Sequence, residues 1–168
     1  AFGDSGSGSE EQLELARQME KFDPDFIVHT GDVLEEGLDA VADDQYFIPY
    51  RRMLAKHPFF LALGNHDYGR KYNKPEGRRF LRENYTPFHT MPYTGLPPYY
   101  YFFDDGDARF FVLDTNYFHG AKWAQPLDKD SKQYKWLERY LARTGTAWKF
   151  VVIHQPLYST GAHEISEA

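Results

Sequence analysis

Four short apolar runs of this chain each end in a tight turn that carries side chains able to bind a metal ion. These side chains are Asp4, Asp32, Asn65 and His154, and His66 directly follows Asn65. In an open α/β sheet the carboxyl ends of parallel strands lie along one edge, where ligands bind. Two carboxylates brought together there repel each other unless a cation lies between them. The pattern therefore predicts a metal site at the edge of a sheet.

The donor groups indicate which chemistry such a site could perform. The chain contains no cysteine, which excludes disulfides, thiolate metal sites and cysteine nucleophiles. Carboxylate, amide and imidazole donors suit Mn, Fe, Zn or Mg ions. Two such ions held about 3.5–4 Å apart form the arrangement that enzymes use for in-line displacement at phosphorus. The sequence has no serine-hydrolase, P-loop or zincin motif, so those classes of enzyme have no support.

The elements that must position these residues alternate along the chain. Helical spacing of apolar residues predicts helices, and short β-favouring runs predict strands. We expect helices over residues 10–21, 41–56 and 129–142, and strands over residues 26–30, 59–63 and 148–153. Residues 1–2 resemble the end of a further strand, and residues 99–103 and 109–113 predict a hairpin. Alternation of this kind favours βαβ units with parallel strands.

Length and composition restrict the function further. With 168 residues, of which 42% are hydrophobic, the chain fits a single domain over residues 1–168. Its net charge of −6 leaves no basic surface for a nucleic-acid backbone. Its apolar runs fall far short of the roughly 20 residues that a membrane-spanning helix needs. We therefore expect no nucleic-acid partner and no membrane partner.

Taken in order, the four turns resemble the motifs of the calcineurin-like metallophosphoesterases. The motifs are Gly3-Asp4-Ser5-Gly6, Gly31-Asp32, Gly64-Asn65-His66-Asp67 and Val152-Ile153-His154. The first motif has a glycine where other branches have a second metal-binding histidine, which is typical of the purple-acid-phosphatase-like branch. The resemblance covers nearly the whole chain. It implies an α/β fold, a four-layer α/β/β/α sandwich of two sheets flanked by helices.

The resemblance also implies a ligand set. Two divalent or trivalent metal ions would be bound, with Fe, Mn or Zn as the expected identities. Asp4 would bind the first ion, Asp32 would bridge both ions, and Asn65 and His154 would bind the second ion. This assignment gives each of the four turns a role in a dinuclear metal centre.

The same resemblance implies a hydrolase that acts on phosphate esters, and more narrowly a phosphomonoesterase of the acid-phosphatase kind. A metal-bound hydroxide would be the nucleophile, and His66 would contact the phosphate and stabilise or protonate the leaving oxygen. His163, in a looser motif, resembles the second substrate-facing histidine of the family. The substrate would be a small-molecule phosphate ester, and the family favours an extracytoplasmic location. The alternatives are a phosphodiesterase and a catalytically impaired binding domain of the same fold.

Two departures from the family pattern support the binding-domain alternative. Purple members carry a metal-binding tyrosine three residues after the bridging aspartate, and Glu35 stands at that position here. The later Gly-His-x-His motif of the family, which completes both metal ions, does not occur before Ala168. We therefore expect a domain truncated at both ends, without the C-terminal Gly-His-x-His part. Its exposed apolar surface would favour self-association.

Two other polar groups have a structural interpretation. His29 lies inside an expected strand, and we expect it to be a hydrogen-bonded core residue. Asp114-Thr115-Asn116 ends another strand and could support the metal ligands from behind.

Overall fold

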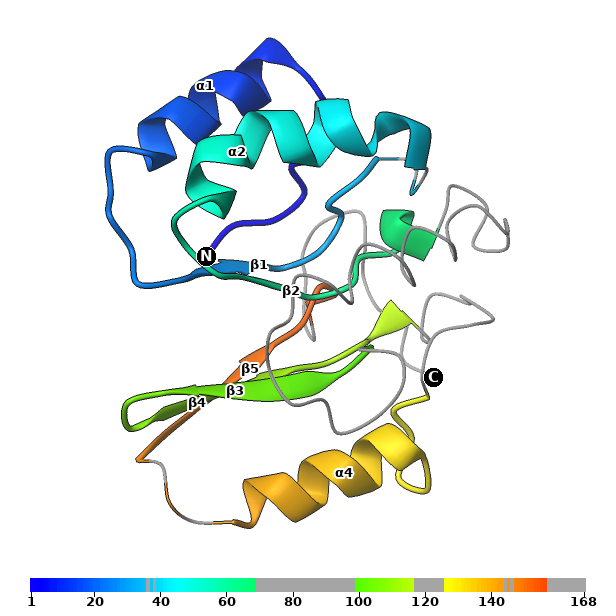
Figure 1. Ribbon diagram of the computed structural model, residues 1–168. Coiled ribbons are helices and arrows are strands. Elements are labelled where there is room, and N and C mark those ends of the chain that lie inside the picture. The colour runs from blue at the N-terminus through cyan, green and yellow to red at the C-terminus, as the bar shows by residue number, and fades with distance from the viewer. Residues whose placement is uncertain are drawn as a thin grey trace.

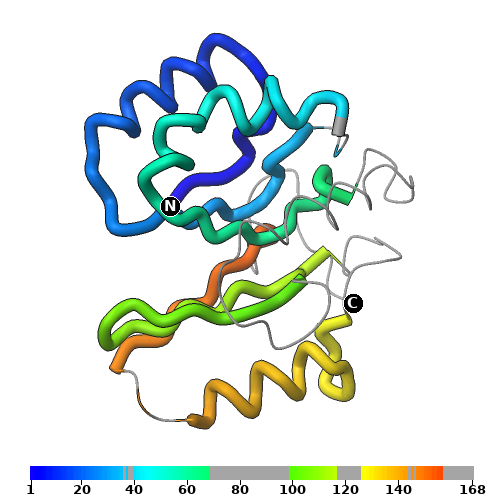
Figure 2. Tube along the Cα trace, in the orientation of Figure 1, coloured from blue at the N-terminus to red at the C-terminus, as the bar shows by residue number. Residues whose placement is uncertain are grey.

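Helices and strands form four layers in the computed structural model, which describes residues 1–35, 37, 39–68, 99–116, 126–143, 145 and 147–156 (Figures 1 and 2). Helices α1 (Glu10–Met19) and α2 (Ile48–Leu54) cover a sheet made of β1 (Ile27–His29) and β2 (Phe59–Leu61). A second sheet contains β3 (Tyr101–Asp105), β4 (Ala108–Val112) and β5 (Trp148–Val152). Helix α4 (Lys132–Leu141) covers the far face of this sheet. This order of layers confirms the predicted α/β/β/α sandwich.

The first sheet is parallel, and its residues alternate between two hydrophobic cores. Ile27 pairs with Phe59, and Val28 pairs with Phe60. Ile27 and Phe59 pack in the core beneath α1 and α2, whereas Val28 and Phe60 face the second sheet. Phe2 extends this sheet through a parallel bridge to His29 in β1, so the first turn of the chain lies beside the turn that follows β1.

Stacked aromatic rings join the two sheets. Phe60 of β2 lies over Phe103 of β3, with ring centroids 3.6 Å apart and an angle of 7° between the planes. Phe103 stacks on Phe110 of β4, and Phe110 stacks on Phe150 of β5, each at 4.8 Å. Strands β3 and β4 pair antiparallel, as the hairpin prediction required, and β4 and β5 pair parallel. Aromatic pairs of this kind contribute more stability than their buried area alone would give. This row of stacked rings therefore helps to hold the two sheets face to face.

The expected helix over residues 41–56 is interrupted. A 3₁₀ turn (Asp39–Val41) and a π-helix (Asp43–Phe47) precede α2. Pro49 lies in the first turn of α2 and has no N–H group, so it cannot donate to the carbonyl of Gln45 four residues earlier. The side chain of Gln12 in α1 donates to that carbonyl instead, at 2.6 Å. A contact between two helices therefore replaces a hydrogen bond within one helix.

The other predicted elements are present, with ends that differ by a few residues, as is usual for such boundaries. The sequence also favours a short helix over residues 76–84, but this range lies outside the described residues, as does His163. None of the helices in the described ranges is long and apolar enough to span a membrane.

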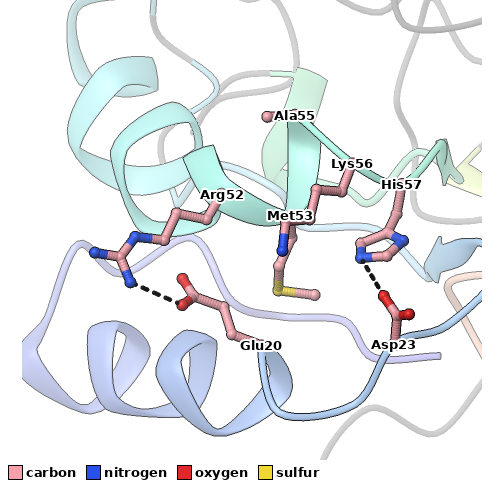
Figure 3. A pocket seen from close by; sticks show the side chains of 7 residues that line it. All are labelled: Glu20, Asp23, Arg52, Met53, Ala55, Lys56 and His57. Carbon is pink, nitrogen blue, oxygen red and sulfur yellow. Dashed lines mark hydrogen bonds and ion pairs between the residues drawn. The ribbon is translucent and has the colours of Figure 1, made fainter.

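A pocket of about 310 Å³ lies at the ends of α1 and α2 (Figure 3). Arg52 of α2 pairs with Glu20 at 3.2 Å, and the His57 ring lies 3.7 Å from a carboxylate oxygen of Asp23. These contacts tie the segment after α1 to α2 and the loop that follows it. Arg52 and His57 already pair with acidic groups of the pocket, and none of Asp4, Asp32, Asn65 and His154 lines it. We therefore interpret the pocket as the contact region between the two helices, and call it the seam between α1 and α2.

Candidate metal centre

The structure brings Asp4, Asp32 and His154 together. One carboxylate oxygen of each aspartate and one ring nitrogen of the histidine all lie within 4.8 Å of one another. Asp4 follows the bridge at Phe2, and Asp32 follows β1, so both come from the first sheet. His154 instead follows β5 of the second sheet. The expectation that all ligands share the edge of one sheet is therefore wrong, because the site lies where two facing sheets end.

Backbone geometry shows why the turns are rich in glycine. Asp4 and Asp32 both have φ of 53°, in the left-handed region that aspartate tolerates better than most residues. Gly31 has φ of 109°, and a Cβ there would come within 2.7 Å of the Gly64 nitrogen and the His154 Nδ1 atom. A Cβ on Gly64 would come within 2.0 Å of the Asp32 Oδ1 atom. Both aspartates thus have strained backbone conformations, and the turns that follow β1 and β2 lie in close contact. Backbone strain of this kind is common at functional sites.

The buried carboxylate of Asp67 holds two of these turns. It accepts hydrogen bonds from the backbone N–H groups of Asp32, Val33 and Leu34 at 2.9–3.1 Å, and from that of Gly64 at 2.8 Å. A carboxylate that accepts several backbone bonds is a strong anchor. Asp67 belongs to the third motif, but its type and position alone predicted no role for it; the available signal was an acid two residues after the asparagine of a glycine turn.

His154 presents one ring nitrogen to the other candidate ligands. Its Nδ1 atom donates to the carbonyl oxygen of Thr30 at 3.0 Å. Its Nε2 atom therefore faces Asn65 Oδ1 at 3.0 Å and Asp32 Oδ2 at 3.4 Å. A histidine whose second nitrogen donates to a backbone carbonyl is the arrangement usual for metal-binding imidazoles. The two carboxylates, the amide oxygen and this nitrogen fit a hard or borderline cation.

Charges at the site favour a positive group between the carboxylates. Burial alone would lower the pKa of His154, but the hydrogen bond and charge of Asp32, with the charges of Asp4 and Asp67, outweigh it and raise this pKa above its ordinary value. Burial would raise the pKa of Asp32, yet the hydrogen bond and charge of His154, and then the backbone N–H and charge of His66, lower it. Asp32 is thus held as a carboxylate, which is the form that binds metal ions.

A network of buried polar groups supports Asn65. Gln155 donates from Nε2 to Asn116 Oδ1 at 2.8 Å and to Asn65 Oδ1 at 3.4 Å. Asn116 donates to the carbonyl oxygen of Leu63 at 2.9 Å and to Asp114 Oδ1 at 3.0 Å. Residues 114–116 thus contact Gln155 and the Leu63 carbonyl beside the candidate ligands, and their support of bound metal ions stays a prediction. Gln155 was missed, although it directly follows His154.

His66 lies beside the three-residue group but not in it. Its backbone N–H donates to Asp32 Oδ1 at 2.9 Å, and its ring Nδ1 donates to the carbonyl oxygen of Glu35 at 2.6 Å. The ring Nε2 atom lies 3.9 Å from Asp32 Oδ2, and 33% of the side chain is exposed. Because Nδ1 is already bonded, Nε2 is the atom left to exchange a proton with solvent or substrate.

Glu35 does not join the group either, among the residues that the structure describes. Its carboxylate is 61% exposed and lies 3.7 Å from His66 Nδ1. Glu35 therefore does not take the place of the metal-binding tyrosine that the family pattern has at this position.

His29 is a core residue, as expected. It is fully buried, and its pKa falls to about 3, because burial disfavours the charged ring and the charge of His154 acts in the same direction. Its Nδ1 atom accepts a hydrogen bond from the Gly31 N–H at 3.2 Å. Since Nδ1 accepts, Nε2 carries the proton of the neutral ring and donates to Ser5 Oγ at 2.9 Å.

This neutral histidine predicts how stability depends on pH. In the unfolded chain His29 has a pKa of about 6.5, whereas in the folded chain its pKa is about 3. Between these values the unfolded state binds one more proton, so the free energy of unfolding should fall by about 1.4 kcal/mol for each pH unit of acidification. Urea unfolding at a series of pH values should show this slope as the difference between wild type and His29→Asn. Parallel curves for the two proteins would contradict it.

Comparisons with known proteins agree with the motifs and the layers. The model of the calcineurin-like phosphoesterase family matches residues 1–168. Purple acid phosphatases 4 and 7 of Arabidopsis thaliana are each 25% identical to this chain, over 92% and 99% of it. A purple acid phosphatase structure, PPD1 from yellow lupin (Lupinus luteus) seeds, superposes with a TM-score of 0.73 at 21% identity and covers 96% of this chain. The chain spans 49% and 55% of the two Arabidopsis proteins and 31% of the lupin chain.

Proposed function

The chain belongs to the calcineurin-like phosphoesterase family, and from this premise we propose that it hydrolyses phosphate monoesters of small molecules in a metal-dependent reaction. One observation carries the proposal: oxygens of Asp4 and Asp32 and a nitrogen of His154 lie within 4.8 Å of one another in strained turns. Three of its relatives are named as purple acid phosphatases, which supports the monoester over the diester.

Four residues would hold the metal ions. Asp4 would bind the first ion, Asn65 and His154 the second, and Asp32, which lies within reach of Asp4 and His154, would be shared by both. Fe, Mn and Zn are the expected identities, since the donor set is oxygen and nitrogen. When bound, such ions neutralise charge on a phosphoryl group and make water acidic enough to react near neutral pH.

His66 would assist the leaving group. Its Nδ1 atom is held by the Glu35 carbonyl, so a proton on Nε2 can pass to the leaving oxygen of an ester bound over Asp32. The backbone N–H of His66 also keeps Asp32 Oδ1 oriented. A second substrate-facing role for His163 stays a prediction, as do an extracytoplasmic location and the bridging of two ions.

The test is hydrolysis of p-nitrophenyl phosphate and of bis(p-nitrophenyl) phosphate after loading with Mn²⁺, Zn²⁺ or Fe³⁺. We expect faster turnover of the monoester, and loss of activity after chelation. Preference for the diester would favour the phosphodiesterase alternative. Metal binding without hydrolysis of either ester would favour the binding-domain alternative. Asp130→Asn, at a side chain that is 94% exposed, is the matched control for substitutions at the site.

Self-association is a further part of the proposal. In β5, Trp148 is 66% exposed and Val151 is 52% exposed, and among the described strands β5 pairs only with β4. An apolar strand with a free edge tends to pair with an identical strand in a second copy of the chain. We expect concentration-dependent dimers in analytical ultracentrifugation, weakened by Trp148→Lys. Phe22→Lys, at a 73% exposed residue between α1 and β1, should leave them unchanged, and equal effects of both would contradict pairing through β5.

A further inference from the structure

We propose that His29 is a positioning residue whose neutral ring ties together the two turns that carry Asp4 and Asp32. The inference rests on the proposed metal site, because it assigns a role in holding that site to a buried side chain that touches neither carboxylate.

The ring reaches one neighbour of each carboxylate. Its Nε2 atom donates to the hydroxyl of Ser5, which follows Asp4, at 2.9 Å. Its Nδ1 atom accepts the N–H of Gly31, which precedes Asp32, at 3.2 Å. A neutral imidazole is the side chain that offers one donor and one acceptor on opposite sides of a rigid ring. His29 therefore links the first two turns with two hydrogen bonds of opposite sense.

Backbone pairing holds the two strand ends together, but the Gly31 N–H is bonded by a side chain instead. The Thr30 N–H donates to the Phe2 carbonyl at 2.8 Å, and the Asp4 N–H donates to the Gly31 carbonyl at 2.9 Å. The Gly31 N–H points to the ring of His29. An apolar residue at position 29 would leave this buried N–H without that acceptor, and an unpaired buried N–H is costly.

The turn that follows β1, which His29 contacts through the Gly31 N–H, has two successive residues with positive φ. Gly31 has φ of 109° and Asp32 has φ of 53°, so small rearrangements of the Gly31 peptide would rotate the Asp32 carboxylate. The edge of the Phe2 ring packs against the imidazole, with centroids 4.6 Å apart and an angle of 70°, which keeps the ring itself from turning. Groups that orient metal ligands in this way typically change metal affinity 10–100-fold when they are removed.

The experiment is a Mn²⁺ titration of the whole chain, with urea unfolding of each metal-free variant alongside it. His29→Leu removes both hydrogen bonds and should raise the Mn²⁺ dissociation constant about 10–100-fold. His29→Asn places an amide oxygen near the position of Nδ1, so it should recover part of the Mn²⁺ affinity that His29→Leu loses. Phe111→Leu, in the buried core beside α4, is the control for a loss of stability remote from the turns.

The outcomes separate the inference from the proposed function. Absence of Mn²⁺ binding by the wild-type chain would overturn both. Wild-type binding together with unchanged affinity in His29→Leu would overturn the inference alone. An equal loss of Mn²⁺ affinity in Phe111→Leu would also overturn the inference alone, because His29 would then act like any other core residue.

A second variant keeps the inference testable if His29→Leu does not fold. Ser5→Ala removes one of the two hydrogen bonds and leaves the imidazole in place. We expect the Mn²⁺ dissociation constant to rise about fivefold, which corresponds to the usual net contribution of one hydrogen bond. Wild-type affinity in Ser5→Ala would contradict the link between the two turns.

Discussion

Asp32→Asn should weaken Mn²⁺ binding at least about 100-fold, beyond the range typical of groups that only orient ligands. Asp32 is the carboxylate assigned to both ions, its Oδ2 atom lies 3.4 Å from His154 Nε2, and its lowered pKa keeps it charged. Replacement by an amide removes that charge while preserving size and the acceptor for the His66 N–H. The measurement is a Mn²⁺ titration combined with elemental analysis after metal-replete purification.

Asp4 and Asp32 should differ in how strongly their loss weakens Mn²⁺ binding. Asp4→Asn should cost less than Asp32→Asn, because Asp4 is exposed and is assigned to one ion rather than to both. Asp130→Asn should bind Mn²⁺ as the wild type does. If Asp4→Asn and Asp32→Asn were equally affected, the shared position of Asp32 would have to be abandoned.

His66→Ala should leave the metal content unchanged and lower kcat roughly 10²–10⁴-fold, the usual contribution of an acid–base group. The His66 ring lies outside the group of Asp4, Asp32 and His154, and a third of its side chain is open to solvent. Its loss therefore removes a proton donor rather than a ligand. Hydrolysis of p-nitrophenyl phosphate and elemental analysis of the same sample give the two readouts.

His57→Ala is the matched control for the loss of an imidazole, because His57 lies in the seam between α1 and α2 (Figure 3). It should retain wild-type turnover and wild-type metal content. A His66→Ala protein that loses its metal would show that His66 is a ligand and that its assigned role is wrong.

The sequence by itself determined the chemistry of the turns. Glycine next to aspartate, after a short apolar run, indicated a sharp turn, and the structure shows left-handed aspartates there. The residue types also determined the alternating elements, because apolar periodicity is a local property that strand and helix geometry impose directly. Asp4, Asp32, Asn65 and His154 could therefore be selected before any coordinates were known.

Only the tertiary structure decided which partners these residues have. His154 reaches Thr30 across 124 positions of the chain, and it does so from the second sheet rather than from the first. The four N–H groups bound by Asp67 and the contact of Gln12 with the carbonyl of Gln45 are likewise invisible in the sequence. The reason is physical: local pattern determines which face of an element is apolar, whereas the packing of two sheets through Phe60 and Phe103 determines which loop ends meet.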